Sequence, residues 1–113
     1  MPARLPPKDY EAEPHPARPR PTVDEKLAAL ARHNKACVDF LKTDVAAGLT
    51  FAETARTART SSKRERNRHS ARRAYDTVTK LIGRVTLTEF DAKILGRDLA
   101  RLKSELRGLG ESF

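Results

Sequence analysis

The sequence predicts an all-α protein, a small antiparallel three-helix bundle that follows a disordered proline-rich arm. All seven prolines lie within the first 21 residues of the chain. From residue 22 onward apolar residues recur at helical spacing, and no alternating pattern typical of a strand extends beyond about four residues. A chain of 113 residues is long enough for one small domain, which we place at residues 22–113.

Residues 1–21 form the predicted arm. Proline lacks a backbone donor and keeps the residue before it out of the α region. The segment has few apolar side chains to bury, so little would offset the backbone entropy lost on ordering, ~1–2 kcal/mol per residue. We therefore expect a disordered or polyproline-like arm.

The first helical stretch begins after Thr22, which has the spacing of a capping box with Glu25. Apolar residues then continue at helical spacing without interruption by proline. We expect an extra N-terminal helix over 23–32 and the first core helix over 35–59, separated by a break or bend near residues 32–34. One continuous helix is the alternative.

Residues 60–63 are predicted to form a turn, and two further helices follow it, over 65–84 and 89–108. The earlier of the two has an amphipathic stripe at helical spacing. The later one has Thr88 as its predicted N-cap and Gly110 as its C-cap glycine. Its leucines alternate at spacings of four and three residues, a short heptad-like seam: Leu95, Leu99, Leu102, Leu106 and Leu109.

The net charge of +8 is concentrated between residues 56 and 73, a stretch that contains eight basic residues and only one acidic residue, Glu65. Those eight are the candidate polyanion-binding residues: Arg56, Arg59, Lys63, Arg64, Arg66, Arg68, Arg72 and Arg73. Binding of nucleic acid or another polyanion is therefore an alternative function, and salt would weaken it steeply. A solvated surface is the competing interpretation, because no aromatic side chain is interleaved for base stacking.

Arg64 and His69 have the spacing Arg-x-x-x-x-His, which resembles the nuclease motif of HEPN-type helical domains. The resemblance is confined to this motif. It implies a ribonuclease that depends on His69, which is a third and more remote interpretation.

Residues that carry other chemistry are few. One cysteine, Cys37, excludes an internal disulfide framework, and the three histidines (His15, His33 and His69) predict no metal site. No apolar run approaches the ~18 residues of a membrane span, and the first residues lack the core of a signal peptide. We expect a cytoplasmic protein with no metal, no cofactor and no membrane span.

Two of the predicted helices carry small residues together with one tyrosine: Ala52, Ala55, Ala71, Ala74 and Tyr75. The pattern resembles the packing helices of tetratricopeptide-like and MIT-like hairpins, in which small residues admit close helix contact and a tyrosine fills the groove. The resemblance covers about residues 36–108. It implies an all-helical protein-binding module.

The leading prediction is accordingly a non-enzymatic helical protein-interaction module. Its partner would be a protein helix or a second copy of the chain, docked on the groove between helices or on the leucine seam. A heptad-like seam in a chain with only 5% aromatic residues indicates that some apolar surface is shared with a partner. The candidate partner-binding residues are Tyr75, Leu99, Leu102 and Leu106.

Overall fold

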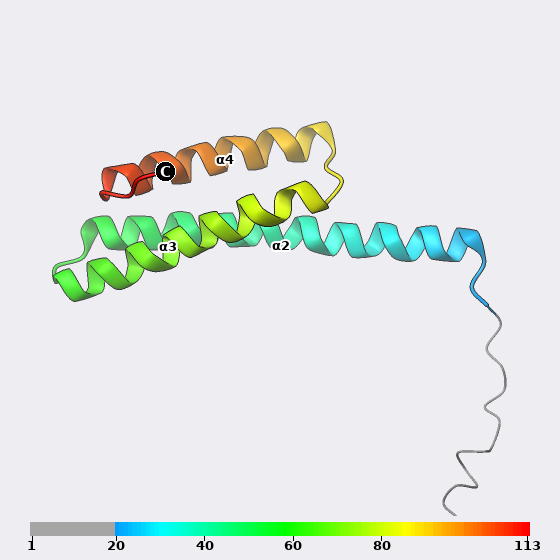
Figure 1. Ribbon diagram of the computed structural model, residues 1–113, viewed down its shortest axis with the longest axis horizontal. Coiled ribbons are helices and arrows are strands. Elements are labelled where there is room, and N and C mark those ends of the chain that lie inside the picture. Colours follow the sequence, from blue (N-terminus) through cyan, green and yellow to red (C-terminus); the bar gives the residue numbers. More distant parts are fainter. Residues whose placement is uncertain (1–19) are drawn as a thin grey trace, which may run out of the picture.

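The computed structural model describes residues 20–113, so nearly all of the predicted arm lies outside the described residues. The elements of the described part are all helical: α2 (Val23–Thr57), α3 (Ser61–Leu81), the short 3-10 helix η1 (Ile82–Arg84) and α4 (Glu89–Gly108). Figure 1 shows α2, α3 and α4 lying side by side as a three-helix bundle. The predicted all-α bundle is therefore confirmed.

Helix α2 is one uninterrupted helix of 35 residues, and the expected bend at residues 32–34 is wrong. Asn34 does not compete for the backbone of its own helix, as asparagine within a helix often does. Its side-chain amide instead donates to the carbonyl oxygen of Thr86 (2.9 Å) and accepts from the backbone N–H of Thr86 (2.8 Å). The capping box at the start of α2 is present as predicted, with reciprocal bonds between Thr22 and Glu25.

Helix α3 begins at Ser61, four residues before the predicted start. The expected turn at residues 60–63 is wrong because Thr60 is an N-cap, and its side chain accepts from the backbone N–H of Lys63 (3.2 Å). The connection between α2 and α3 is therefore shorter than predicted, and Arg59 lies in it. At the other end, α3 gives way at residue 82 to η1, which occupies the last part of the predicted helix.

Helix α4 has the bounds that the sequence predicts. The hydroxyl of Thr88 accepts from the backbone N–H of Asp91 (3.0 Å). At its C-terminal end Gly110 has a φ of +96°, a conformation that glycine adopts without the penalty of a Cβ atom. Backbone bonds from Gly110 to Arg107 and from Glu111 to Leu106 complete a Schellman motif, which turns the chain back toward α3.

Side chains of α3 and α4 meet at Gly48 of α2. A Cβ atom at this position would lie 2.8 Å from Cδ2 of Leu102 and 3.0 Å from Cβ of Ala74. The small residue on this face of α2 thus admits close packing by α3 and α4 of the same chain. Ala52 and Ala55 are fully buried on the same face.

The core consists of two adjoining clusters along the bundle. The first joins α2 to α3 and α4 through four buried residues: Leu41, Val45, Val78 and Leu95. The second uses smaller side chains from α2 and α3 against two leucines of α4: Ala52, Ala71, Leu102 and Leu106.

The N-terminal part of α2 extends beyond the other helices (Figure 1). Residues 20–33 are all exposed, and buried positions begin only at Val38. The difference in helix length accounts for this, since α2 has 35 residues and α3 has 21. At ~1.5 Å per residue α3 covers only part of α2. We refer to residues 23–34 as the projecting segment.

Candidate functional site

The basic residues of the predicted polyanion site lie at the α2–α3 end of the bundle, and three of them are held by acidic side chains of the same chain. Arg56 is paired with Glu53, and this hydrogen bond raises the pKa of Arg56. Arg68 is paired with Glu65 and with Glu111. The hydrogen bond that Arg68 donates to Glu65 raises the pKa of Arg68.

Arg72 is the most heavily engaged of the eight. It donates to Asp76 (3.0 Å), to Glu111 (2.8 Å) and to the carbonyl oxygen of Ser112 (2.9 Å). Its guanidinium also lies over the ring of Phe113, 4.3 Å from the centroid. A delocalised cation that is both hydrogen-bonded and stacked in this way is a poor candidate for binding an external anion.

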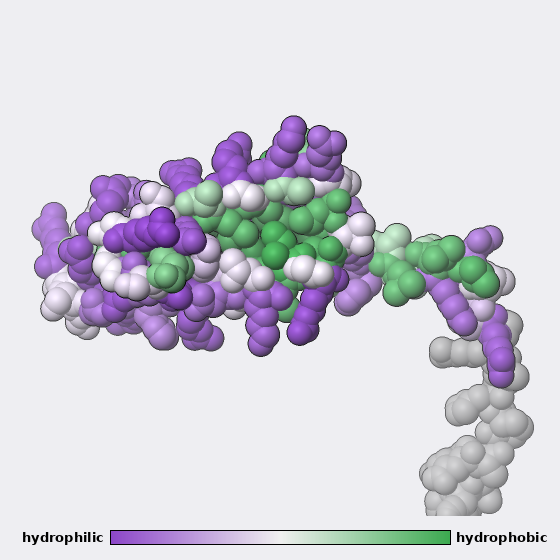
Figure 2. All heavy atoms as spheres, turned by 45° about the horizontal axis from the view of Figure 1, so that its top comes forward, coloured by the Kyte–Doolittle hydropathy of each residue, from purple (hydrophilic) through white to green (hydrophobic). Residues whose placement is uncertain are grey.

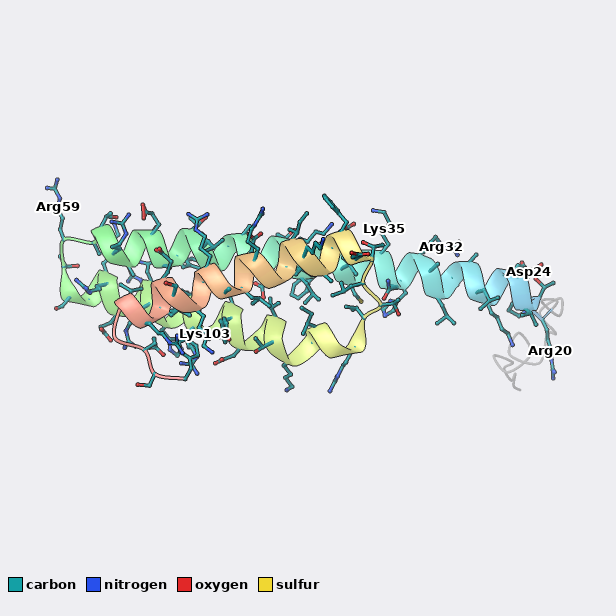
Figure 3. The ribbon with its side chains drawn as sticks, turned by 90° about the horizontal axis from the view of Figure 1, so that it is seen from above. Arg20, Asp24, Arg32, Lys35, Arg59 and Lys103 are labelled. Carbon is teal, nitrogen blue, oxygen red and sulfur yellow. The ribbon has the colours of Figure 1, made fainter. Side chains whose placement is uncertain are left out.

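Residues 111–113, which we call the closing segment, cover this part of α3. The Schellman turn brings Glu111 between Arg68 and Arg72, where its side chain is only 13% exposed. Phe113 meets Tyr75 edge to face, with ring centroids 5.0 Å apart. In Figure 3 Lys103 of α4 lies beside the same segment, with its Nζ atom 5.3 Å from the Phe113 centroid.

Five of the eight basic residues are exposed and form no ion pair with another residue of the described range 20–113: Arg59, Lys63, Arg64, Arg66 and Arg73. Figure 3 shows Arg59 pointing away from the end of the bundle. The predicted set of eight is therefore two groups, one engaged within the chain and one open to solvent.

Arg64 and His69, the pair of the nuclease-like motif, are both exposed on α3. Residues five apart on an α-helix are about 140° apart around its axis at 3.6 residues per turn. The two side chains therefore leave α3 in different directions. Within one chain they do not converge on a common reacting atom, as a general base and its partner must.

The leucines predicted to bind a partner are placed differently from the expectation. Leu102 and Leu106 are fully buried in the core, so they form no docking surface. Leu99 is partly buried and packs on the core cluster around Leu95, and Tyr75 is partly buried beneath Phe113. The heptad-like seam of α4 packs within the same chain: Leu102 lies against Gly48 of α2, and Leu102 and Leu106 share a cluster with Ala52 of α2 and Ala71 of α3.

An exposed apolar stripe that the sequence analysis did not single out lies on the projecting segment. Val23, Leu27 and Leu30 are 70%, 59% and 64% exposed, on successive turns of α2. Figure 2 shows hydrophobic side chains gathered on this projecting part and again on the adjoining end of the bundle. Neighbouring exposed apolar side chains on one face of a helix mark a candidate interaction surface.

The stripe leads into a pocket of about 570 Å³ where α2 enters the bundle. Leu30, Phe40 and Leu41 line it from α2, and Leu81 and Val85 from the other side. Phe40 is 51% exposed although it is one of only six aromatic residues in the chain.

His33 and Cys37 also line the pocket, and the sequence analysis overlooked their four-residue spacing. Sγ of Cys37 lies 3.6 Å from Nε2 of His33. They do not make a metal site with a third ligand, since residues 20–113 contain no group of three His, Cys, Asp or Glu side chains arranged to hold an ion. Nor is any helix of that part of the chain long and apolar enough to cross a membrane.

Comparisons of the chain with protein-family models, with curated proteins and with solved structures each find no match.

Proposed function

We propose that the chain is a non-enzymatic helical interaction module that docks another protein chain on the projecting segment of α2 and the pocket at its base. The observation that carries the proposal is the high exposure of Val23, Leu27 and Leu30 on one helix face. Burying a side chain of this kind against a partner stabilises the complex by roughly 1.5–3 kcal/mol. Apolar side chains at this spacing, on successive turns of one helix face, are the typical anchors when a helix binds in a groove of its partner.

The position of the stripe within α2 supports the same proposal. Its residues continue the face that, farther along α2, is buried by α3 and α4 at Leu41 and Val45. One face of one helix is thus covered by the chain's own helices over most of its length and left uncovered by the described residues over the rest. A partner helix placed there would continue the packing that the bundle already uses.

A catalytic role for the pocket is disfavoured by its backbone. His33 and Cys37 could act as base and nucleophile, but both lie within continuous α-helix. The backbone N–H groups around them are bonded within that helix, so they are not free to stabilise an oxyanion. A thiol and an imidazole without such donors suit packing against a partner better than acyl transfer.

A photo-crosslinking experiment tests the proposal. The photoreactive residue benzoylphenylalanine is placed at position 30 in cells of the source, and in a matched variant at Arg97, an exposed position of α4. We expect a discrete protein adduct from position 30 that is lost when Leu27→Asp is added, and none from position 97. Equal labelling from both positions, or labelling that Leu27→Asp leaves unchanged, would contradict the proposal.

A further inference from the structure

We infer that the partner of the projecting segment is a second copy of this chain, with the two segments packed antiparallel about a two-fold axis. The inference rests on the proposed function, because it uses the same surface and names its occupant. A two-fold interface requires a surface that is complementary to itself. The projecting segment and the pocket meet this requirement together.

The spacing and length of the projecting segment suit an antiparallel pair. The apolar positions Val23, Leu27 and Leu30 are spaced by four and then three residues, which is the seam of a coiled coil. The projecting segment is 12 residues long, about 18 Å at the rise of an α-helix. Two such segments laid antiparallel overlap along their whole length, and the bundles then lie at opposite ends without competing for space.

The pocket at the base of α2 lies where the other copy of α2 would begin. In the antiparallel arrangement the first turn of each α2 reaches the place where the other α2 enters its bundle. Val23 of one copy then lies at the apolar pocket lined by Phe40, Leu81 and Val85 of the other. Val23, the most exposed residue of the stripe, and the pocket would thus cover each other twice, once in each copy.

Acidic and basic side chains lie at opposite ends of the projecting segment. Asp24 and Glu25 lie in the first turn of α2, whereas Arg32 and Lys35 lie nearer the bundle, where Lys35 also pairs with Asp39 of its own helix (3.0 Å; Figure 3). Antiparallel pairing sets acidic side chains against basic ones, and parallel pairing would set like charges together. Lys26 lies beside the acidic pair and reduces this contrast. The apolar seam therefore supplies the affinity, and the charges select the direction.

The association is measured on the full chain by analytical ultracentrifugation over a range of protein concentrations. We expect a reversible dimer with a dissociation constant on the order of 10–100 µM, since the contact is small. Leu27→Asp should raise that constant by tenfold or more without changing the helical circular dichroism of the bundle. Phe51→Asp is the matched control: Phe51 is 37% exposed on α2, about 25 Å along the helix from the end of the projecting segment, and its replacement should leave the constant unchanged.

The orientation is tested with the single native cysteine. Antiparallel overlap brings residue 20 of one copy near Cys37 of the other, whereas parallel overlap brings residue 20 near residue 20. Oxidation of the Arg20→Cys variant should therefore give a 20–37 disulfide in peptide mapping, and Cys37→Ser should remove it. A dominant 20–20 disulfide would overturn the antiparallel arrangement.

The outcomes separate this inference from the proposed function. A chain that stays monomeric at about 1 mM, yet still gives the Leu27-dependent adduct from position 30 with a different protein, contradicts the second copy and supports the docking surface. A monomer that gives no such adduct contradicts both. A dimer that Leu27→Asp leaves intact forms elsewhere and overturns the inference.

Discussion

The two ends of the bundle differ in whether the chain covers its own side chains. At the α2–α3 end, the closing segment turns back at Gly110 and places Glu111 between Arg68 and Arg72. At the other end, α2 continues past its neighbours and exposes an apolar stripe with a pocket at its base. The basic end is thus partly neutralised from within, and the opposite end, where acidic and basic side chains balance, is left uncovered by residues 20–113.

This difference supports the proposal that a partner docks on the projecting segment. Charged side chains are well solvated by water, and surface ion pairs within the chain change their free energy little. Exposed Leu and Val side chains gain free energy only by leaving water. The basic segment dominates the composition, but the projecting segment has the larger unmet driving force for association.

The largest expected effect comes from truncating a leucine inside the bundle. Leu102 is fully buried, so Leu102→Ala should lower the free energy of unfolding by about 2–5 kcal/mol. Leu30, 64% exposed, is the matched control, and Leu30→Ala should change it by less than about 0.5 kcal/mol in the monomer. Urea unfolding at low protein concentration measures both. Equal losses would mean that the projecting segment is covered by its own chain.

The next effect compares two glycines inside helices. Gly48→Ala places a Cβ atom against Leu102 and Ala74, and overpacking of this kind costs about 1–3 kcal/mol, more than the ~1 kcal/mol that alanine gains in helix propensity. Gly96 of α4 has no heavy atom within 4 Å of such a Cβ, so Gly96→Ala should stabilise the chain by up to ~1 kcal/mol. Thermal unfolding should show shifts of opposite sign. A stabilising Gly48→Ala would show that α2 and α4 leave room for a methyl group between them.

Local signals in the sequence were enough to predict the helices and several of their ends. Thr22, Thr88 and Gly110 act through hydrogen bonds to residues within a few positions, and each is found where the sequence placed it. The bend near Asn34 was wrong because the outcome depended on Thr86, 52 residues away. The turn at Thr60 was misjudged because the same residue type favours turns and N-caps.

The site was harder to predict than the fold. Periodicity shows that one face of a helix is apolar, but it does not show what covers that face. The same spacing therefore suggested a partner for Leu102, which is buried, and gave no reason to single out Leu27, which is exposed. The missing information was the relative length of α2 and α3, which the expected bend obscured. The contact of His33 with Cys37, in contrast, could have been found from their four-residue spacing.

A smaller effect is expected at the basic end. If exposed residues such as Arg59 and Lys63 bind polyanions, Glu111→Gln should remove the acidic partner that Arg68 and Arg72 share and strengthen binding of duplex DNA by several-fold. The slope of log affinity against log salt should steepen by about 0.9 for each additional phosphate that the protein neutralises. Fluorescence anisotropy across a salt series measures both quantities.

Glu89→Gln is the control for this experiment, since it removes the same charge from an 87% exposed side chain of α4. Equal increases in affinity from Glu89→Gln and Glu111→Gln would show that the closing segment does not mask an anion site. Absence of binding by all three proteins at low salt would leave the basic end as a solvated surface.

The smallest expected effect is acid fraying of the first turn of α2. Hydrogen bonds from the backbone N–H and hydroxyl of Thr22 lower the pKa of Glu25 below its ordinary value of 4.5. Because the pKa is lower in the folded state, the capping box stabilises the turn fully above pH 4.5, and this contribution is lost as the pH falls through the lowered value. The protection factor of the Lys26 amide, measured by hydrogen exchange and corrected for the intrinsic exchange rate, should therefore decrease as the pH is lowered. In Glu25→Gln, whose amide can accept the same backbone bond at any pH, protection should stay constant.

The pKa of Asp91 is also lowered, first by its bond to Lys42 (2.6 Å), but that pair joins α2 to α4. Its protonation should lower the stability of the whole bundle, so loss of protection confined to the first turn of α2 would separate the open end from the packed one.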